Sequence, residues 1–199
     1  MPIEISSTDR VPEDVLSTLV EELPDEFQAS TADHRIALCS MEPPAWFTLI
    51  ADLDWWIKIL GGYAAIYLAS ITNAAGKETW EKRSEITSYI RRVTRSIIKA
   101  KSQCEKHTHA ELAIKLPDLY YEAKLYLSNG NEEKVAKELA LFIHYAPEVV
   151  KIYNNHISSG GKITGWVGLR ILPNDSMEVN FMDGDTSDNV QHVLERKNS

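Results

Sequence analysis

Cysteine is scarce in this chain. Only Cys39 and Cys104 occur among its 199 residues, far apart and within apolar or helical surroundings. Small secreted domains instead carry closely spaced cysteines that form a disulfide framework. The first residues, Met-Pro-Ile-Glu-Ile, also have neither the basic region nor the apolar run of a secretory signal. These absences predict a cytoplasmic protein without structural disulfides.

Local catalytic motifs are also missing. The chain has no G-x-S-x-G nucleophile turn, and Gly160-Gly161-Lys162 lacks the upstream glycine and the following hydroxyl of a phosphate-binding loop. Asp52 and Asp54 are two residues apart, so on a helix they would point to different faces. We therefore expect a protein that is not an enzyme. Catalytic residues can be assembled in space, so an enzyme without a local motif remains the third interpretation.

Two segments contain the residue types of metal ligands. Cys104, His107 and His109 form a C-x2-H-x-H cluster, but a closed zinc site needs a fourth ligand. The segment 183–188 is rich in oxygen ligands, yet its acids do not have the spacing of a calcium loop. We predict a junction between a helix and a strand at the first segment and a solvated turn at the second. No metal and no cofactor are expected.

Charge is unevenly distributed along the chain. The net charge is -8, which disfavours general nucleic-acid binding because phosphate contacts need a basic surface. Residues 77–106 are the exception, with nine Lys or Arg against four Glu, a local charge of +5. Within them, Arg91, Arg95 and Lys99 recur every four residues and therefore share one helix face. We call these three residues the basic stripe.

The basic stripe has two interpretations. It could bind a protein partner that carries an acidic patch, because complementary charge steers association. Alternatively it is a solvated face that is partly compensated by the acids of residues 132–138, since exposed ion pairs contribute little to stability. We take Arg91, Arg95 and Lys99 as the candidate partner-binding residues.

The segment 59–76 is the longest stretch without a charged side chain. As a core helix it would be covered on all sides, and Gly61, Ala65 and Ala69, small residues at four-residue spacing, would lie at a close helix contact. As a membrane segment it would be near the required length of about 20 apolar residues, flanked by Trp55 and Trp56 as interfacial aromatics. We favour the core helix and keep membrane docking by residues 55–76 as the alternative.

Periodicity of the apolar residues predicts the elements. Alternation with a period of two indicates strands, and spacings of three and four indicate helices. Strands are expected at 3–5, 34–41, 109–116, 119–127, 163–172 and 177–182, and helices at 12–23, 45–106 with a break at Gly76, and 132–157 with a restart at Pro147.

This order of elements predicts a single α+β domain over residues 1–183. It would have a mainly antiparallel or mixed sheet and a long central helical hairpin at 44–106. Residues 184–199 are polar and are expected to form a flexible tail. The sparse motifs and the local charge favour a non-catalytic interaction or regulatory module of the inhibitor, immunity or accessory type. It would bind a larger protein partner in the cytoplasm; the alternative is a membrane-associated protein.

Overall fold

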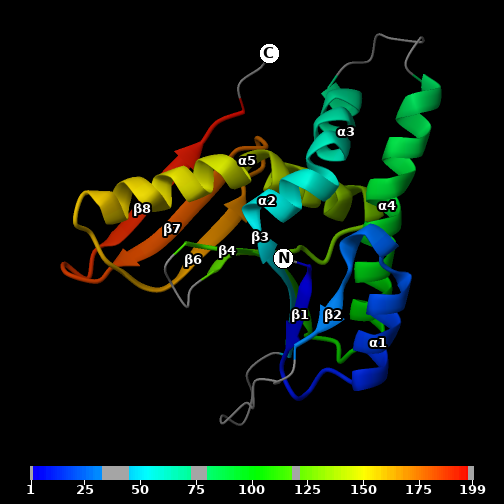
Figure 1. Ribbon diagram of the computed structural model, residues 1–199. Helices are drawn as coiled ribbons and strands as arrows, with labels where there is room; N and C mark the ends of the chain where they lie inside the picture. The colour runs from blue at the N-terminus through cyan, green and yellow to red at the C-terminus, as the bar shows by residue number, and fades with distance from the viewer. Residues whose placement is uncertain (1, 33–44, 73–79, 118–121, 197–199) are drawn as a thin grey trace.

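The computed structural model describes residues 2–32, 45–72, 80–117 and 122–196, and the side chains of these ranges except 72 and 80–86 (Figure 1). The strands are β1 (Glu4–Ser7), β2 (Ser30–Thr31), β3 (Trp46–Asp52), β4 (His109–Lys115), β5 (Glu122–Tyr126), β6 (Ile163–Ile171), β7 (Met177–Asp183) and β8 (Asn189–Leu194). The helices are α1 (Glu13–Glu22), a 3-10 turn η1 (Asp25–Phe27), α2 (Leu53–Trp56), a π-helical turn η2 (Ile57–Gly61), α3 (Gly62–Thr72), α4 (Trp80–Ser102) and α5 (Glu132–Ser158).

All eight strands form one mixed sheet in the order β2-β1-β3-β4-β5-β6-β7-β8. The β1–β2, β3–β4 and β5–β6 pairs are parallel and the other neighbours are antiparallel. Together with the helices, this mixed sheet confirms the predicted α+β class.

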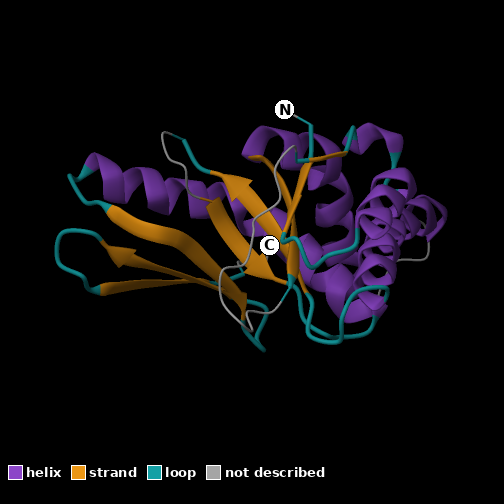
Figure 2. Ribbon diagram, turned by 90° about the horizontal axis from the view of Figure 1, so that it is seen from below, coloured by secondary structure: helices purple, strands orange, loops and turns teal. Residues whose placement is uncertain are grey.

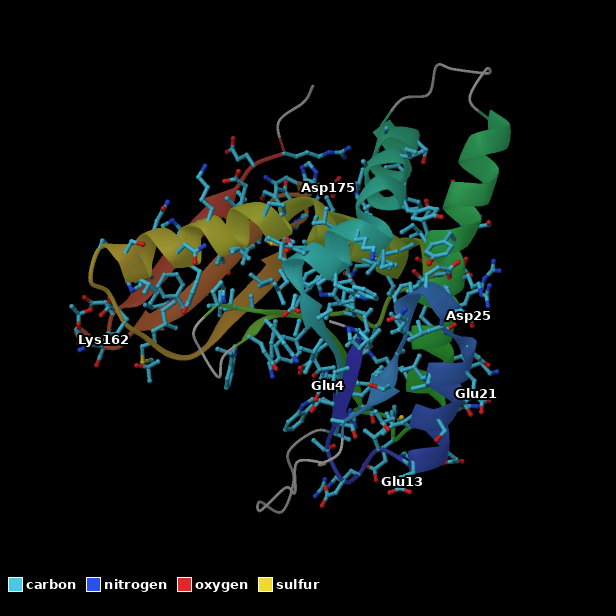
Figure 3. The ribbon with its side chains drawn as sticks, in the orientation of Figure 1. Glu4, Glu13, Glu21, Asp25, Lys162 and Asp175 are labelled. Carbon is cyan, nitrogen blue, oxygen red and sulfur yellow. The ribbon has the colours of Figure 1, made fainter. Side chains whose placement is uncertain are left out.

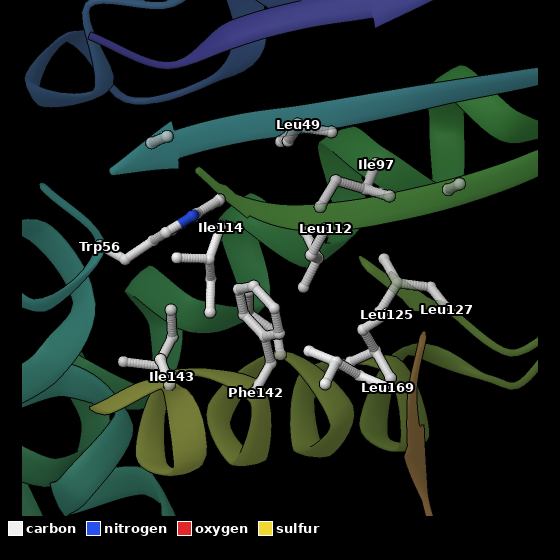
Figure 4. Close-up of a cluster of buried hydrophobic side chains, with 14 of the residues drawn as sticks. Leu49, Trp56, Ile97, Leu112, Ile114, Leu125, Leu127, Phe142, Ile143 and Leu169 are labelled. Carbon is white, nitrogen blue, oxygen red and sulfur yellow. The ribbon is translucent and has the colours of Figure 1, made fainter. Parts of the chain in front are cut away.

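The helices cover one face of the sheet, which we call the helix face (Figures 1 and 2). Figure 4 shows Leu112, Ile114 and Leu125 of the strands directed toward Phe142 of α5. Trp56 lies in the same cluster, where its ring meets Phe142 edge-on at a centroid distance of 5.6 Å. Alternation along each strand sends every second side chain to the opposite face, which we call the open face. This face is exposed over β5 to β8, whereas its residues on β3 and β4 are buried.

Two strands near the centre of the sheet differ from expectation. Residues 46–52 were expected to begin a long helix, but they form β3, which is buried on both faces. A short apolar run that is buried on both sides has no period of its own, so it cannot be distinguished from a buried helix by pattern. β4 was expected to be half-buried and is also covered on both faces. The strand predicted at 34–41 lies outside the described residues.

The predicted helical hairpin of residues 44–106 is therefore wrong in its first arm. Residues 46–52 belong to β3, and the helical path from Leu53 to Thr72 passes through two short helices and the π-helical turn. Its second arm, α4, forms as a 23-residue helix, and Ile90, Val93 and Ile97 of its predicted apolar stripe are buried. α3 and α4 do pack together, with the rings of Tyr63 and Tyr89 stacked at 4.2 Å.

The predicted close contact at Gly61, Ala65 and Ala69 is not formed. Ala65 and Ala69 are exposed, while Ala64, Tyr67 and Leu68 face the core. Both sets of residues lie in one uncharged run, and only packing against α4 and α5 decides which side is covered.

The carboxyl-terminal half follows the prediction more closely. The β6–β7 hairpin forms where the alternating pattern and the turn residues place it. α5 continues through Pro147 instead of restarting there, because a proline costs one helical hydrogen bond and the packed helix on both sides outweighs that loss. The predicted polar tail at 184–199 contains β8, which pairs with β7 over six residues.

Candidate binding surfaces

The basic stripe lies on the side of α4 that faces away from the sheet, and each of its members meets an acid of this chain. Arg95 Nε lies 2.7 Å from Glu132 Oε2, and Arg91 Nε lies 4.0 Å from Glu132 Oε1. Lys99 donates to the carboxylate of Glu22 at the end of α1. The spacing therefore predicted the shared face correctly. Glu132 is one of the acids of residues 132–138 that the solvated-face interpretation named, and the tertiary structure adds Glu22 of α1.

Arg95 and Lys99, with their acidic partners, line a solvent-open groove of about 770 Å³ between α1, α4 and the start of α5. Figure 3 labels Glu21 on α1, which is one of the residues that line the groove. The groove is lined by Glu21, Glu22, Arg92, Arg95, Ser96, Ile98, Lys99, Ser102, Gly130, Asn131 and Glu132. Charges of both signs stand along it, so it suits a polar protein surface better than a ligand of a single charge.

The open face of the sheet is a second surface, and over β5 to β8 it carries exposed apolar side chains among polar ones. Tyr126, Trp166, Met182 and Val193 are 48%, 58%, 50% and 51% exposed, and they come from four neighbouring strands. Val193 is paired with Glu178, and Tyr126 is paired with Glu111, which places each of them on the side opposite the buried residues of its strand. Figure 2 shows α5 along the other side of these strands.

Gly168 lies in the middle of this surface, paired with Lys124 on one side and Asn180 on the other. A Cβ added at this glycine would meet only the backbone oxygen of Asn180, at an ordinary contact distance of 3.6 Å. The fold therefore tolerates a side chain at this position, which lies two residues from Trp166 along β6. Glycine within a strand is typical of sites where another molecule or backbone approaches closely.

Glu111 is the buried acid of the open face. It is 3% exposed and accepts a hydrogen bond of 2.7 Å from the hydroxyl of Thr48, its neighbour on β3. Burial raises the pKa of Glu111, and the Thr48 hydroxyl and the charge of Lys124 oppose that shift only in part. The carboxyl of Glu111 therefore stays protonated to a higher pH than an exposed glutamate does.

A histidine–aspartate pair lies at the far end of α5. His156 Nε2 is 3.1 Å from Asp183 Oδ2, and the imidazole ring packs against Phe181. The other carboxylate oxygen accepts the backbone N–H groups of Asp185 and Thr186, and these two bonds, with His156, lower the pKa of Asp183. The arrangement ties the helix end to the β7–β8 turn, which is the turn that the sequence predicted at 183–188.

The candidate zinc ligands are not assembled into a site. Cys104 Sγ donates to the backbone oxygen of Ala100, and burial raises the pKa of its thiol. His109 packs edge-on against Tyr126, and burial lowers its pKa. Within the described ranges, which include Cys104, His107 and His109, no three His, Cys, Asp or Glu side chains are placed to hold a metal ion.

The sequence reasoning missed the apolar part of the open face. The available signal was that Trp166 and Met182 occupy positions of their strands where the alternation predicts polar side chains. An aromatic or large apolar residue on the polar side of a strand indicates either a second covered face or a binding surface.

Comparison with known proteins gives no match: no family model, no curated protein and no solved structure is significantly similar to this chain. None of the helices in the described ranges is both long and apolar enough to cross a membrane.

Proposed function

We propose that the protein is a non-catalytic interaction module that binds a protein partner on the open face of β5 to β8. The observation that supports this proposal is the group of four half-exposed apolar side chains, Tyr126, Trp166, Met182 and Val193, on neighbouring strands. Trp166 and Met182 lie toward one end of this face and Tyr126 and Val193 toward the other, with Gly168 between them, so a partner would cover two exposed apolar groups together.

The composition of the surface also fits a protein partner. Tyr, Trp, Met and Arg are enriched in the centres of protein interfaces, and Arg170 lies on the same strand as Trp166 and is exposed. Burying a tryptophan that is more than half exposed in the free protein removes a large apolar area from water. Gly168, between Lys124 and Asn180, would let the backbone of the partner approach the sheet closely.

The basic stripe would form a second, electrostatic contact with an acidic patch of the partner. The side chains of Arg91, Arg95 and Lys99 are about half exposed or more even though they pair with Glu132 and Glu22. A partner carboxylate could therefore compete with these exposed pairs, which contribute only about 0–1 kcal/mol each. An inhibitor, immunity or accessory protein would use such a combination of an apolar surface and a charged surface.

The main experiment is capture of partners from a native extract, followed by binding measurements on the purified partner. Trp166→Ala and Tyr126→Ala should each weaken binding by about 2 kcal/mol or more, the usual loss for an aromatic at the centre of an interface. Ile157→Ala, which truncates an exposed apolar side chain of α5 away from this surface, is the matched control and should bind as the wild type does. Equal binding by Trp166→Ala and the control would reject the open face as the partner surface.

The contribution of the basic stripe is tested separately. Arg91→Glu combined with Arg95→Glu should leave the thermal unfolding midpoint nearly unchanged and slow the association rate at low salt. The association rate of the wild type should fall as salt is added. An unchanged rate in the double variant would leave the stripe as a solvated face.

A second candidate function is docking to a membrane surface through residues 55–76. It is favoured by Ile57, Ile66 and Ile71, which are exposed on η2 and α3 close to the exposed Ala65. Co-sedimentation with vesicles that contain anionic lipid is the test, with Ile66→Glu as the disruptive variant and Trp166→Ala as its control. No sedimentation of the wild type with vesicles would reject this candidate.

A further inference from the structure

The strand β8 forms one end of the sheet and has an open backbone edge. It pairs with six consecutive residues of β7, without a bulge, and in the described ranges it is the last strand of the sheet. The strand at the opposite end, β2, has only two residues. An edge strand presents unpaired N–H and C=O groups, which can pair with a strand of another chain.

The register shows which residues of β8 present these groups outward. The N–H of Asp183 donates to the carbonyl of Asp188 over 2.9 Å, one position beyond the paired Met182 and Asn189. Antiparallel ladders alternate between hydrogen-bonded and non-hydrogen-bonded pairs. The even-numbered residues of β8 therefore direct their backbone groups toward β7, and Asn189, Gln191 and Val193 direct theirs outward.

The sequence of β8 does not protect this edge. The strand reads Asn-Val-Gln-His-Val-Leu, with no charged residue and no proline. Natural edge strands usually carry lysine, proline or a bulge that prevents pairing with another sheet. Six residues of regular, uncharged strand are long enough to form a stable ladder with a second strand.

We propose that a second copy of this chain pairs with β8 in antiparallel orientation, which joins the two sheets in a two-fold symmetric dimer. The two-fold axis of such a dimer runs perpendicular to the sheets, so the helix faces of both copies lie on the same side. Residues that lie directly opposite each other on the two β8 strands are on the same face of the sheet. Along β8, the residues on one face are either all even-numbered or all odd-numbered. One residue of β8 must therefore lie directly opposite the same residue of the other copy, and the axis passes between these two.

Charge selects His192 as the residue on the axis. In that register Asp188 of one copy lies opposite Arg196 of the other, and Val190 lies opposite Leu194. An axis through Gln191 would place Asp188 opposite Leu194 instead, and would leave both charges without an opposed partner. Arg196 is held beside the helices by a hydrogen bond of 3.1 Å from its Nη2 to the carbonyl of Leu68, and its guanidinium carries further donors for a carboxylate.

The test is sedimentation velocity of the full chain over a series of concentrations. The wild type should show a reversible equilibrium between monomer and dimer. Gln191→Pro removes an outward N–H and leaves the even-numbered bonds to β7 in place, so it should abolish the dimer without unfolding the chain. Gln191→Thr keeps the N–H and should still dimerise. A wild type that is monomeric at all concentrations, or a dimer that survives Gln191→Pro, would overturn the proposal.

A charge exchange tests the register without relying on proline. Asp188→Arg and Arg196→Asp should each weaken the dimer about tenfold, because each cross-strand pair occurs twice in the dimer. The variant with both changes restores opposite charges and should recover most of the affinity. Failure of the double variant to recover would reject the axis at His192. This pairing uses the sheet edge and the proposed partner surface uses the open face, so each proposal can fail alone.

Discussion

Thr48 and Glu111 are joined across the β3–β4 pair by a hydrogen bond of 2.7 Å in the buried centre of the open face. The carboxyl of Glu111 is nearly inaccessible to water, and burial raises its pKa above the ordinary value of 4.5. An ionised carboxylate at this position is therefore less favourable than in the unfolded chain.

This relationship predicts how stability changes with pH. Because the folded-state pKa lies above the unfolded value, the contribution of Glu111 is fully present below pH 4.5 and is lost as the pH rises through the folded-state pKa. Glu111→Gln should therefore gain stability relative to the wild type as the pH is raised. Urea unfolding across a pH series measures this difference.

Thr48→Val is the complementary variant. It removes the hydroxyl that stabilises the carboxylate, so the pKa of Glu111 should rise further. The loss of stability should still begin near the unfolded-state pKa and should extend to higher pH. A constant difference between Glu111→Gln and the wild type at all pH values would contradict the raised pKa.

The different burial of Trp56 and Trp166 predicts that replacing each by phenylalanine has a different effect on stability. Its indole N–H donates over 2.9 Å to the carbonyl of Ala113, and the side chain is fully buried. Trp56→Phe keeps an aromatic ring but leaves that carbonyl without this donor, which should cost about 1–3 kcal/mol of unfolding free energy. Trp166→Phe, at the exposed position, should change stability by no more than about 0.5 kcal/mol. Equal losses at the two sites in chemical denaturation would contradict the different burial.

The closeness of Gly161 to His156 predicts that the effects of substitutions at these two residues on stability are coupled. A Cβ added at Gly161 would lie 2.4 Å from His156 Nε2, so Gly161→Ala must displace the imidazole from Asp183. Overpacking of this kind should cost about 1–3 kcal/mol. In a His156→Ala background the same substitution should cost much less. Thermal unfolding of the four proteins of this double-mutant cycle measures the coupling, and additive effects would show that the clash is relieved elsewhere.

The position of Asn131 at the start of α5 predicts how much this N-cap contributes to stability. Its side-chain oxygen accepts the N–H of Lys134 over 3.0 Å at the first turn of the helix. Asn131→Ala should therefore destabilise the protein by about 1 kcal/mol. Asn154→Ala, at an exposed position of the same helix, is the control and should be neutral or slightly stabilising, since alanine favours the helix. Equal effects of the two variants on the unfolding midpoint would exclude a capping role.

The sequence alone determined the elements whose signals are local. The β6–β7 hairpin was predictable because alternation and the turn at 173–176 agree, and α1 ends before Pro24 because a proline disfavours helix in the preceding residue. The buried side of α4 and the common face of Arg91, Arg95 and Lys99 follow from the helical period.

Only the tertiary structure decided what surrounds those elements. Residues 46–52 are a strand because neighbours on both sides supply the ladder, and a fully buried strand leaves no period in its sequence. Glu22 approaches the basic stripe from a helix that is distant in sequence, and Trp166 is exposed because the described helices pack on the other face. Side-chain periodicity is set within one element, whereas burial and charge pairing depend on which elements the folded chain brings together.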